Sequence, residues 1–316
     1  MKVWLTIATV LVIVGVIIFT ASMTVNGWDL TELSTVKYET NEYEFNEEIE
    51  DISIKTDTAD IVFVPSDNGK CKVVCYEAEN VKHSVSVADG VLTVNAVDSR
   101  KWYEHIGIGF DSPTITVSLP ENEYASLSIK ESTGDIEIPG SLRFESINVS
   151  VSTGDVVCRA SASEAIKIKG STGDIELAEL SAGLIELSTS TGKINVSEVK
   201  CDGDIKIEVS TGKTRLTDIV CQSVISNGNT GDILLKNVVA TERFSIERST
   251  GDVKFDGSDA AEIFVETSTG DVSGSLLTDK VFIPKTGTGD VEVPNSVSGG
   301  RCETITDTGD IRLTIG

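Results

Sequence analysis

Two patterns of apolar residues divide the chain into an N-terminal segment and a long body. Residues 3–28 contain no charged side chain, and the run from Val3 to Met23 is dominated by Val, Ile, Leu and Ala. Such a run is long enough to cross a bilayer as one helix. From residue 49 onward apolar and polar residues alternate in short stretches, and this period of two predicts β-strands.

The apolar run predicts a transmembrane anchor over residues 1–24, with membrane contact through residues 3–23. Lys2 precedes the run and Asp29 follows it, an asymmetry that favours a cytoplasmic N-terminus and an extracytoplasmic body. A cleaved signal peptide is the alternative, although the run is long for one and lacks a clear small-x-small cleavage site. Both interpretations place the body outside the cytoplasm. Residues 25–48 are predicted to form an acidic spacer.

The body repeats every 19 or 20 residues around a Thr-Gly pair that recurs ten times. The residue seven positions before each glycine is always apolar, and two positions after it only Thr214 interrupts an apolar column. Each repeat is therefore predicted as strand, tight turn, strand and second turn, with glycine where the turn needs a positive φ. The ten glycines are Gly134, Gly154, Gly173, Gly192, Gly212, Gly231, Gly251, Gly270, Gly289 and Gly309.

Two architectures can bury this pattern. In a parallel β-solenoid each repeat is one coil stacked on the preceding coil, about 4.8 Å away. Alternatively, each repeat is an antiparallel hairpin and pairs of repeats form propeller blades. The constant repeat length and the ten identical threonines favour stacking of like on like. We therefore predict an all-β fold, a parallel β-solenoid (β-helix) of 19–20-residue coils over residues 126–316, preceded by one N-terminal transmembrane helix.

Residues 49–125 are predicted to form degenerate coils of the same kind, interrupted by an insertion at 98–113. Thr58-Ala59-Asp60 follows two apolar residues in the same frame as the Thr-Gly repeats, and Gly90 lies between similar alternating stretches. Irregular coils are expected here because terminal repeats cap the stack.

The repeated Ser-Thr-Gly-Asp-Ile/Val motif, as at residues 132–136 and 249–253, and the segment at residues 114–120 resemble the bacterial DUF4097 family, also called "putative adhesins". The resemblance covers about residues 49–316. It implies a β-strand-repeat fold, often behind a membrane segment, and no established activity.

The net charge of −24 argues against a nucleic-acid partner, because phosphates would be repelled. Asp follows eight of the ten repeat glycines and would form a column of carboxylates that calcium could bridge. The residues of that column considered for calcium are Asp232, Asp252, Asp271 and Asp290. The favoured alternative is turn chemistry, in which these side chains bond to nearby backbone. Lys193 and Lys213 interrupt the column.

Catalytic chemistry has little support in this sequence. His83 and His105 are the only histidines, so a Ser-His-Asp triad would need one of them. No His-Glu-x-x-His motif, Walker loop or nucleophile elbow is present. A polysaccharide lyase is the enzyme alternative, but such enzymes usually build their clefts from long loops and these coils vary by one residue. We therefore predict a protein that is not an enzyme and has no cofactor.

The insertion gathers Trp102, Tyr103, His105 and Phe110 in a chain with only 5% aromatic residues. This segment is predicted to be either a contact patch or a cap over the open end of the stack, and we favour the cap.

Two of the six cysteines are predicted to be neighbours. Cys201 and Cys221 both lie nine residues after their repeat glycines, so a solenoid places them side by side within disulfide range. Whether they are bonded is left open. None of the cysteine spacings resembles a zinc site.

Taken together, these patterns predict a non-catalytic, membrane-anchored, extracytoplasmic β-solenoid that acts as an adhesin-like surface scaffold or interaction module. Its partner would be a cell-wall or surface ligand. The alternative is an envelope sensor or regulatory partner of another membrane protein. A carbohydrate-active enzyme on a β-helix is the third hypothesis.

Overall fold

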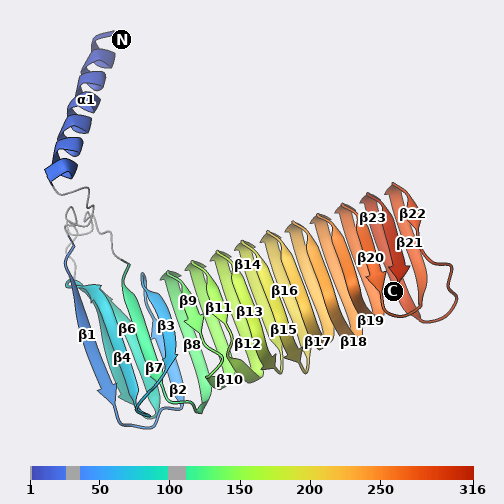
Figure 1. Ribbon diagram of the computed structural model, residues 1–316, viewed down its shortest axis with the longest axis horizontal. Helices are drawn as coiled ribbons and strands as arrows, with labels where there is room; N and C mark the ends of the chain where they lie inside the picture. Colours follow the sequence, from blue (N-terminus) through green and yellow to red (C-terminus); the bar gives the residue numbers. More distant parts are fainter. Residues whose placement is uncertain (1, 26–35, 99–111) are drawn as a thin grey trace.

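The computed structural model describes residues 2–25, 36–98 and 112–316 (Figure 1). Within these ranges the chain forms one helix and 24 strands. Helix α1 (Lys2–Val25) contains a 22-residue stretch, Trp4–Val25, with a mean hydropathy of 2.5. By length and composition this stretch could cross a membrane, as the expected N-terminal apolar helix requires. The aromatic insertion residues Trp102, Tyr103, His105 and Phe110 lie outside the described residues.

The strands after residue 120 stack as a parallel solenoid, and each coil crosses two opposite sheets (Figure 1). Thr153 pairs with Thr133 on one side and Thr172 on the other, so equivalent residues form ladders. This confirms the predicted solenoid and excludes the propeller. The strands are β8 (Glu123–Thr133), β9 (Ile136–Ile138), β10 (Arg143–Thr153), β11 (Val156–Cys158), β12 (Ser161–Thr172), β13 (Ile175–Ala182), β14 (Ile185–Thr191), β15 (Ile194–Cys201), β16 (Asp204–Thr211), β17 (Thr214–Thr230), β18 (Ile233–Thr250), β19 (Val253–Thr269), β20 (Val272–Leu276), β21 (Lys280–Thr288), β22 (Val291–Glu292), β23 (Gly300–Thr308) and β24 (Ile311–Ile315).

The core is a set of apolar ladders between the two sheets. Ile166 and Ile185, each seven residues before a repeat glycine, are paired across adjacent coils and are fully buried. Ile175 and Ile194, two residues after their glycines, form the matching ladder on the opposite sheet. Stacking identical residues gives every coil the same interior shape, which explains why the coil length hardly varies.

The order of coils in space departs from the order in sequence at the C-terminal end. Strand β23 pairs with β19 on one side and β21 on the other, and β24 lies between β20 and β22. The expectation that each repeat stacks on the preceding one is therefore wrong for the last two coils. The difference follows from burial, because Ile311 and Leu313 are buried in the inserted coil whereas Val291 of the terminal coil is 45% exposed.

Residues 36–98 and 112–119 form a cap on the N-terminal end of the stack. The spacer expected over residues 25–48 is therefore wrong for its last part, because Tyr38–Phe45 pairs with Cys71–Ala78 as a strand of the cap. Strands β2 and β3 stack on β8 and β9, and Thr58 bridges Thr133, in the frame expected from Thr58-Ala59-Asp60. Strands β6 and β7 form the next layer outward. The cap strands are β1 (Tyr38–Phe45), β2 (Asp51–Lys55), β3 (Asp60–Pro65), β4 (Cys71–Ala78), β5 (Val81–Ala88), β6 (Val91–Asp98) and β7 (Thr114–Leu119).

The outermost cap strands are antiparallel and do not form the coil expected around Gly90. Strand β5 pairs with β6 as a hairpin, and β4 pairs with both β7 and β1. The reason is the turn at Asp89 and Gly90, whose φ values are 51° and 78°. Two consecutive residues with positive φ form a tight turn that reverses the chain into an antiparallel hairpin. The cap therefore closes the stack with antiparallel strands.

Candidate functional site

A buried carboxylate marks the most unusual place in the described structure. Four alternating residues of β4 point into the cap, namely Cys71, Val73, Cys75 and Glu77, and all are buried. The first three suit an apolar interior. Glu77, with no exposed surface, continues the same inward face. A carboxylate at such a position is costly unless it is paired and hydrogen-bonded.

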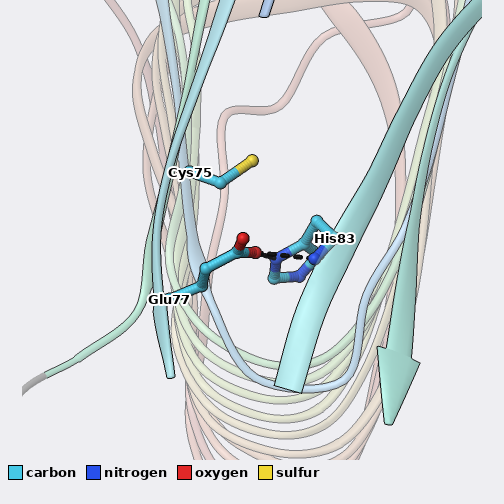
Figure 2. A group of neighbouring side chains, drawn as sticks. All are labelled: Cys75, Glu77 and His83. Carbon is cyan, nitrogen blue, oxygen red and sulfur yellow. Dashed lines mark hydrogen bonds and ion pairs between the residues drawn. The ribbon is translucent and has the colours of Figure 1, made fainter. Parts of the chain in front are cut away.

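His83 on the neighbouring strand β5 is the partner of this carboxylate. The Glu77 Oε2 atom accepts a hydrogen bond from the His83 backbone N at 2.6 Å and lies 2.7 Å from His83 Nδ1. The short β4–β5 connection, with Ala78 paired to Val81, brings the two side chains face to face. In Figure 2, Glu77 extends from one strand toward His83 on the other, and Cys75 projects from the strand of Glu77 into the same interior space.

Two further polar side chains complete the group. Asn41 of β1 donates from Nδ2 to Glu77 Oε1 at 2.7 Å. Thr56, which directly follows β2, places Oγ1 2.9 Å from His83 Nε2. Both carboxylate oxygens and both ring nitrogens therefore have partners. We call Asn41, Thr56, Cys75, Glu77 and His83 the cap cluster.

Cys75 is the member of the cap cluster without a polar partner. Its sulfur lies within 4.8 Å of ligand-type atoms of both Glu77 and His83. Burial, reinforced by the nearby Glu77 carboxylate, raises the pKa of the Cys75 thiol to about 12. The thiol is therefore protonated near neutral pH. In the described part of the chain its sulfur makes no hydrogen bond, and all six cysteines are free thiols.

The cap cluster contains the connectivity of a nucleophilic triad, with a hydroxyl, an imidazole and a carboxylate in sequence through Thr56, His83 and Glu77. Thr56 is only 3% exposed. A substrate carbonyl could not reach its Oγ1 atom unless the cap strands moved apart. The chemistry that fits the closed geometry is therefore metal binding or structural hydrogen bonding, since neither needs a substrate to enter.

The residues predicted from the repeat have clear places in the stack. All ten repeat glycines have φ between 128° and 154°. At Gly212 a Cβ atom would lie 1.7 Å from the Gly192 carbonyl oxygen, so the close approach of coils leaves no room for a side chain. The Thr-Gly turn is thus shaped by both backbone conformation and inter-coil contact.

The repeat aspartates bind backbone of the next coil. Asp232 Oδ1 accepts from Asp252 N, Asp252 Oδ1 from Asp271 N, and Asp271 Oδ1 from Asp310 N. Asp290, in the terminal coil, donates its backbone N–H to Asp310 Oδ1. Lys213 forms an ion pair with Asp232 at 3.0 Å. One oxygen of each of these acceptor carboxylates thereby holds the backbone of the adjacent coil.

Cys201 and Cys221 occupy one inward column of adjacent coils. Cys201 pairs with Ala182 of the preceding coil. Toward the following coil, Lys200 pairs with Val220. Cys201 and Cys221 directly follow these two residues and therefore lie side by side. Both thiols are buried. Cys201 Sγ donates to the Asp204 carbonyl oxygen at 3.5 Å.

Reasoning from the sequence overlooked the cap cluster and several other buried charged groups, among them a buried ion pair. Lys280 and Asp259 form an ion pair of 2.6 Å, with side chains 3% and 9% exposed, in the wall of a cavity of about 620 Å³. The cap cluster left one trace in the sequence, because the alternation of Cys71, Val73 and Cys75 continues to Glu77. The Lys280–Asp259 pair left none, since the two residues belong to different coils.

Comparison with known proteins finds a family whose model matches the repeat-containing part of the chain. The family described as Toastrack DUF4097 matches residues 49–208 and 200–316. No curated protein sequence matches the chain. A solved "putative adhesin" from Bacteroides fragilis is 17% identical, covers 88% of this chain and 97% of its own, and has a TM-score of 0.44.

Two Parabacteroides distasonis structures are similarly distant. A "putative adhesin" is 12% identical over 89% of this chain and 98% of its own, with a TM-score of 0.44. A "putative lipid binding protein" is 16% identical over 76% and 95%, with a TM-score of 0.46. The family match covers most of the chain, including every coil of the solenoid. The chain therefore belongs to the Toastrack DUF4097 family.

Proposed function

We propose that this protein is a membrane-anchored, extracytoplasmic solenoid that works as an adhesin-like scaffold or interaction module. The supporting observation is the pairing of an apolar helix of membrane-spanning length with a rod of regular coils. Repeat proteins of this kind bind partners through extended surfaces, because each coil presents equivalent positions to solvent. Lys2 before the helix and the acidic chain after it favour a body on the extracytoplasmic side.

One part of the rod surface suits an anionic or hydroxyl-rich ligand. A groove of about 410 Å³ crosses the coils of β10, β12, β14 and β16, and its polar lining is Asn148, Lys167, Lys169, Glu186, Ser188, Lys206 and Glu208. Glu186 pairs with Lys167 at 2.9 Å and with Lys206 at 3.7 Å. Lys169 forms no ion pair with any described residue. With three lysines against two glutamates, the groove has one positive charge in excess on a protein whose net charge is −24. We propose it as the binding surface for an anionic cell-wall polymer.

The test uses the full chain reconstituted in lipid vesicles and sedimented with isolated cell walls, with and without millimolar calcium. Saturable binding that falls at least tenfold in Lys167→Glu/Lys169→Glu/Lys206→Glu is expected. Lys236→Glu/Lys254→Glu, which changes exposed lysines on other coils, serves as the control and should bind normally. Wall binding that ignores the groove variant would reject the groove, and binding to membranes alone would favour the regulatory alternative. Calcium-dependent binding would implicate the aspartate column.

A further inference from the structure

We propose that the cap cluster is a zinc site, with Cys75 Sγ, Glu77 Oε2 and His83 Nδ1 as its three protein ligands. Thiolate, carboxylate and imidazole are the ligand types that zinc takes in proteins. Calcium and magnesium require shells of oxygen, which this group does not offer. The three residues lie on two consecutive strands of the cap, where Glu77 and His83 face each other and Cys75 projects into the same interior space (Figure 2).

The distances require little movement for metal binding. The three candidate ligand atoms already lie within 4.8 Å of one another. Around tetrahedral zinc, such atoms would be about 3.3–3.6 Å apart, given bonds of about 2.0–2.3 Å. The Glu77–His83 contact of 2.7 Å would therefore open by less than 1 Å as zinc replaces the proton between them. A water molecule would take the fourth position.

The charges of the proposed site balance. Zinc carries two positive charges, which the Cys75 thiolate and the Glu77 carboxylate offset, while His83 binds as neutral imidazole. The Cys75 proton leaves to solvent. Zinc takes the place of the proton on His83 Nδ1. In a doubly protonated ring that proton leaves to solvent, and in a neutral ring it is transferred to Nε2, so the bound imidazole has its single proton on Nε2. The buried cap would then contain a neutral complex, which removes the desolvation cost of an unpaired ion.

The residues around the ligands are already arranged for this role. Metal-binding histidines usually donate the other ring N–H to an oxygen, and Thr56 Oγ1 lies 2.9 Å from His83 Nε2. Asn41 Nδ2 holds the second oxygen of Glu77 at 2.7 Å and orients the first toward the site. Independently, the Cys75 sulfur is fully buried, lacks a hydrogen bond among the described residues and lies within 4.8 Å of the other two ligand atoms.

A purely structural role would use the same hydrogen bonds but would leave Cys75 as a neutral core residue. The two hypotheses therefore differ in whether the Cys75 thiol binds metal as a thiolate or stays a neutral thiol. Cys71 provides a matched control, because it lies four residues before Cys75 on the same inward face of the same strand and is also buried. Cys201 and Cys221 are the competing thiol pair, and they lie in a different part of the rod.

The experiment titrates the full chain, purified without metal in detergent, with cobalt and then zinc. A near-ultraviolet thiolate-to-cobalt charge-transfer band at about one equivalent is expected, with displacement by zinc and a thermal midpoint that rises with the logarithm of zinc concentration. Cys75→Ala should lose the band and weaken zinc binding at least tenfold. Cys71→Ala and the Cys201→Ser/Cys221→Ser double variant should retain both.

The proposal is overturned if no charge-transfer band forms, if Cys75→Ala keeps it, or if Cys201→Ser/Cys221→Ser removes it. Should Cys75→Ala fail to fold, Cys75→Ser preserves the side-chain shape, and retention of the thiolate band in that variant would also overturn the site. Glu77→Gln supplies a second check, because the amide keeps the shape of the carboxylate but loses its charge. Zinc affinity in Glu77→Gln should fall at least tenfold.

Discussion

At the residue scale, the interior contains charged side chains that are stabilised in unequal ways. Glu77 has donors on both oxygens, and Asp259 pairs with Lys280. Glu131 is less well placed, because Oε1 accepts from Thr133 N at 3.1 Å whereas Oε2 is buried without a partner. A buried charge with partners on all its polar atoms costs less free energy in the folded state than one with an unpartnered atom, so Glu131 should destabilise the fold more than Glu77 does.

Glu131 should make the stability of the protein depend on pH. Burial raises the pKa of this carboxyl from 4.5 to about 7, against the opposing effect of backbone N–H groups. Because the folded state binds this proton more tightly than the unfolded chain, the contribution of Glu131 to stability is greatest below pH 4.5 and is lost as pH rises through 7. At pH 8, Glu131→Gln should therefore have a free energy of unfolding, measured by urea denaturation, that is higher than that of the parent by up to about 3 kcal/mol. At pH 4 the two proteins should differ little. Glu137→Gln, on the exposed face of β9, is the control, and a pH-independent difference would contradict the prediction.

The buried ion pair should be sensitive to loss of one partner. Lys280→Met would leave the Asp259 carboxylate buried with only Thr278 and the backbone N of Ala260 as donors. We expect a loss of about 3–5 kcal/mol in the free energy of unfolding, measured by urea denaturation. The double variant Lys280→Met/Asp259→Leu should recover most of it, since no buried charge remains. Lys285→Met, at an exposed position of the same strand, should change stability by less than about 0.5 kcal/mol. Equal losses in the single and double variants would argue against an ion-pair origin.

At the scale of the element, five successive coils have a second turn with its own backbone requirement. Residues six positions after five successive repeat glycines have φ between 52° and 60°, and four of them are not glycine. They are Glu179, Glu198, Asp218, Asn237 and Gly257. The left-handed conformation costs an ordinary residue roughly 1–2 kcal/mol. The Thr-Gly turns are obvious in the sequence because only glycine fits them, whereas these turns are concealed by side chains that tolerate the strain.

Glycine at the second turn should stabilise a coil. In Glu198→Gly the left-handed strain disappears, and after the added entropy of the unfolded chain we expect a net gain of about 0.5–1 kcal/mol. The control is Glu208→Gly in strand β16, where no positive φ is required and a loss of about 1 kcal/mol is expected. Thermal midpoints of the two variants should move in opposite directions. A shift in the same direction would show that the positive φ at residue 198 does not reduce the stability of the coil.

At the scale of the whole molecule, the sequence predicts what repeats and fails where contacts are unique. Thr-Gly pairs and apolar columns fix the coil, because like residues must stack on like. The antiparallel pairing of β5 with β6 depends on the turn at Asp89 and Gly90, which a repeat frame cannot distinguish from a coil. Cys75, Glu77 and His83 meet only because that cap folds two strands face to face, and no spacing between them encodes the meeting.

The inserted C-terminal coil can be tested by cross-linking. Thr269 pairs in register with Thr308, and Thr308 pairs with Thr288, so a full coil separates residues 269 and 288. Adjacent coils are about 4.8 Å apart and alternate coils about 10 Å. A disulfide needs Cα atoms within about 7 Å. With a mild oxidant such as copper phenanthroline, Thr269→Cys/Thr308→Cys should therefore form an intramolecular disulfide, seen as a gel-mobility shift that reductant reverses.

The pair Thr269→Cys/Thr288→Cys should remain reduced under the same conditions. Thr250→Cys/Thr269→Cys joins neighbouring coils in sequence order and provides the positive control. The native thiols are buried, so their contribution to cross-linking should be small. If the chain stacked strictly in sequence order, residues 269 and 288 would be neighbours and the outcomes of the first two pairs would be exchanged. The cross-linking pattern therefore distinguishes insertion of the last coil from sequential stacking, without relying on the stability of either variant.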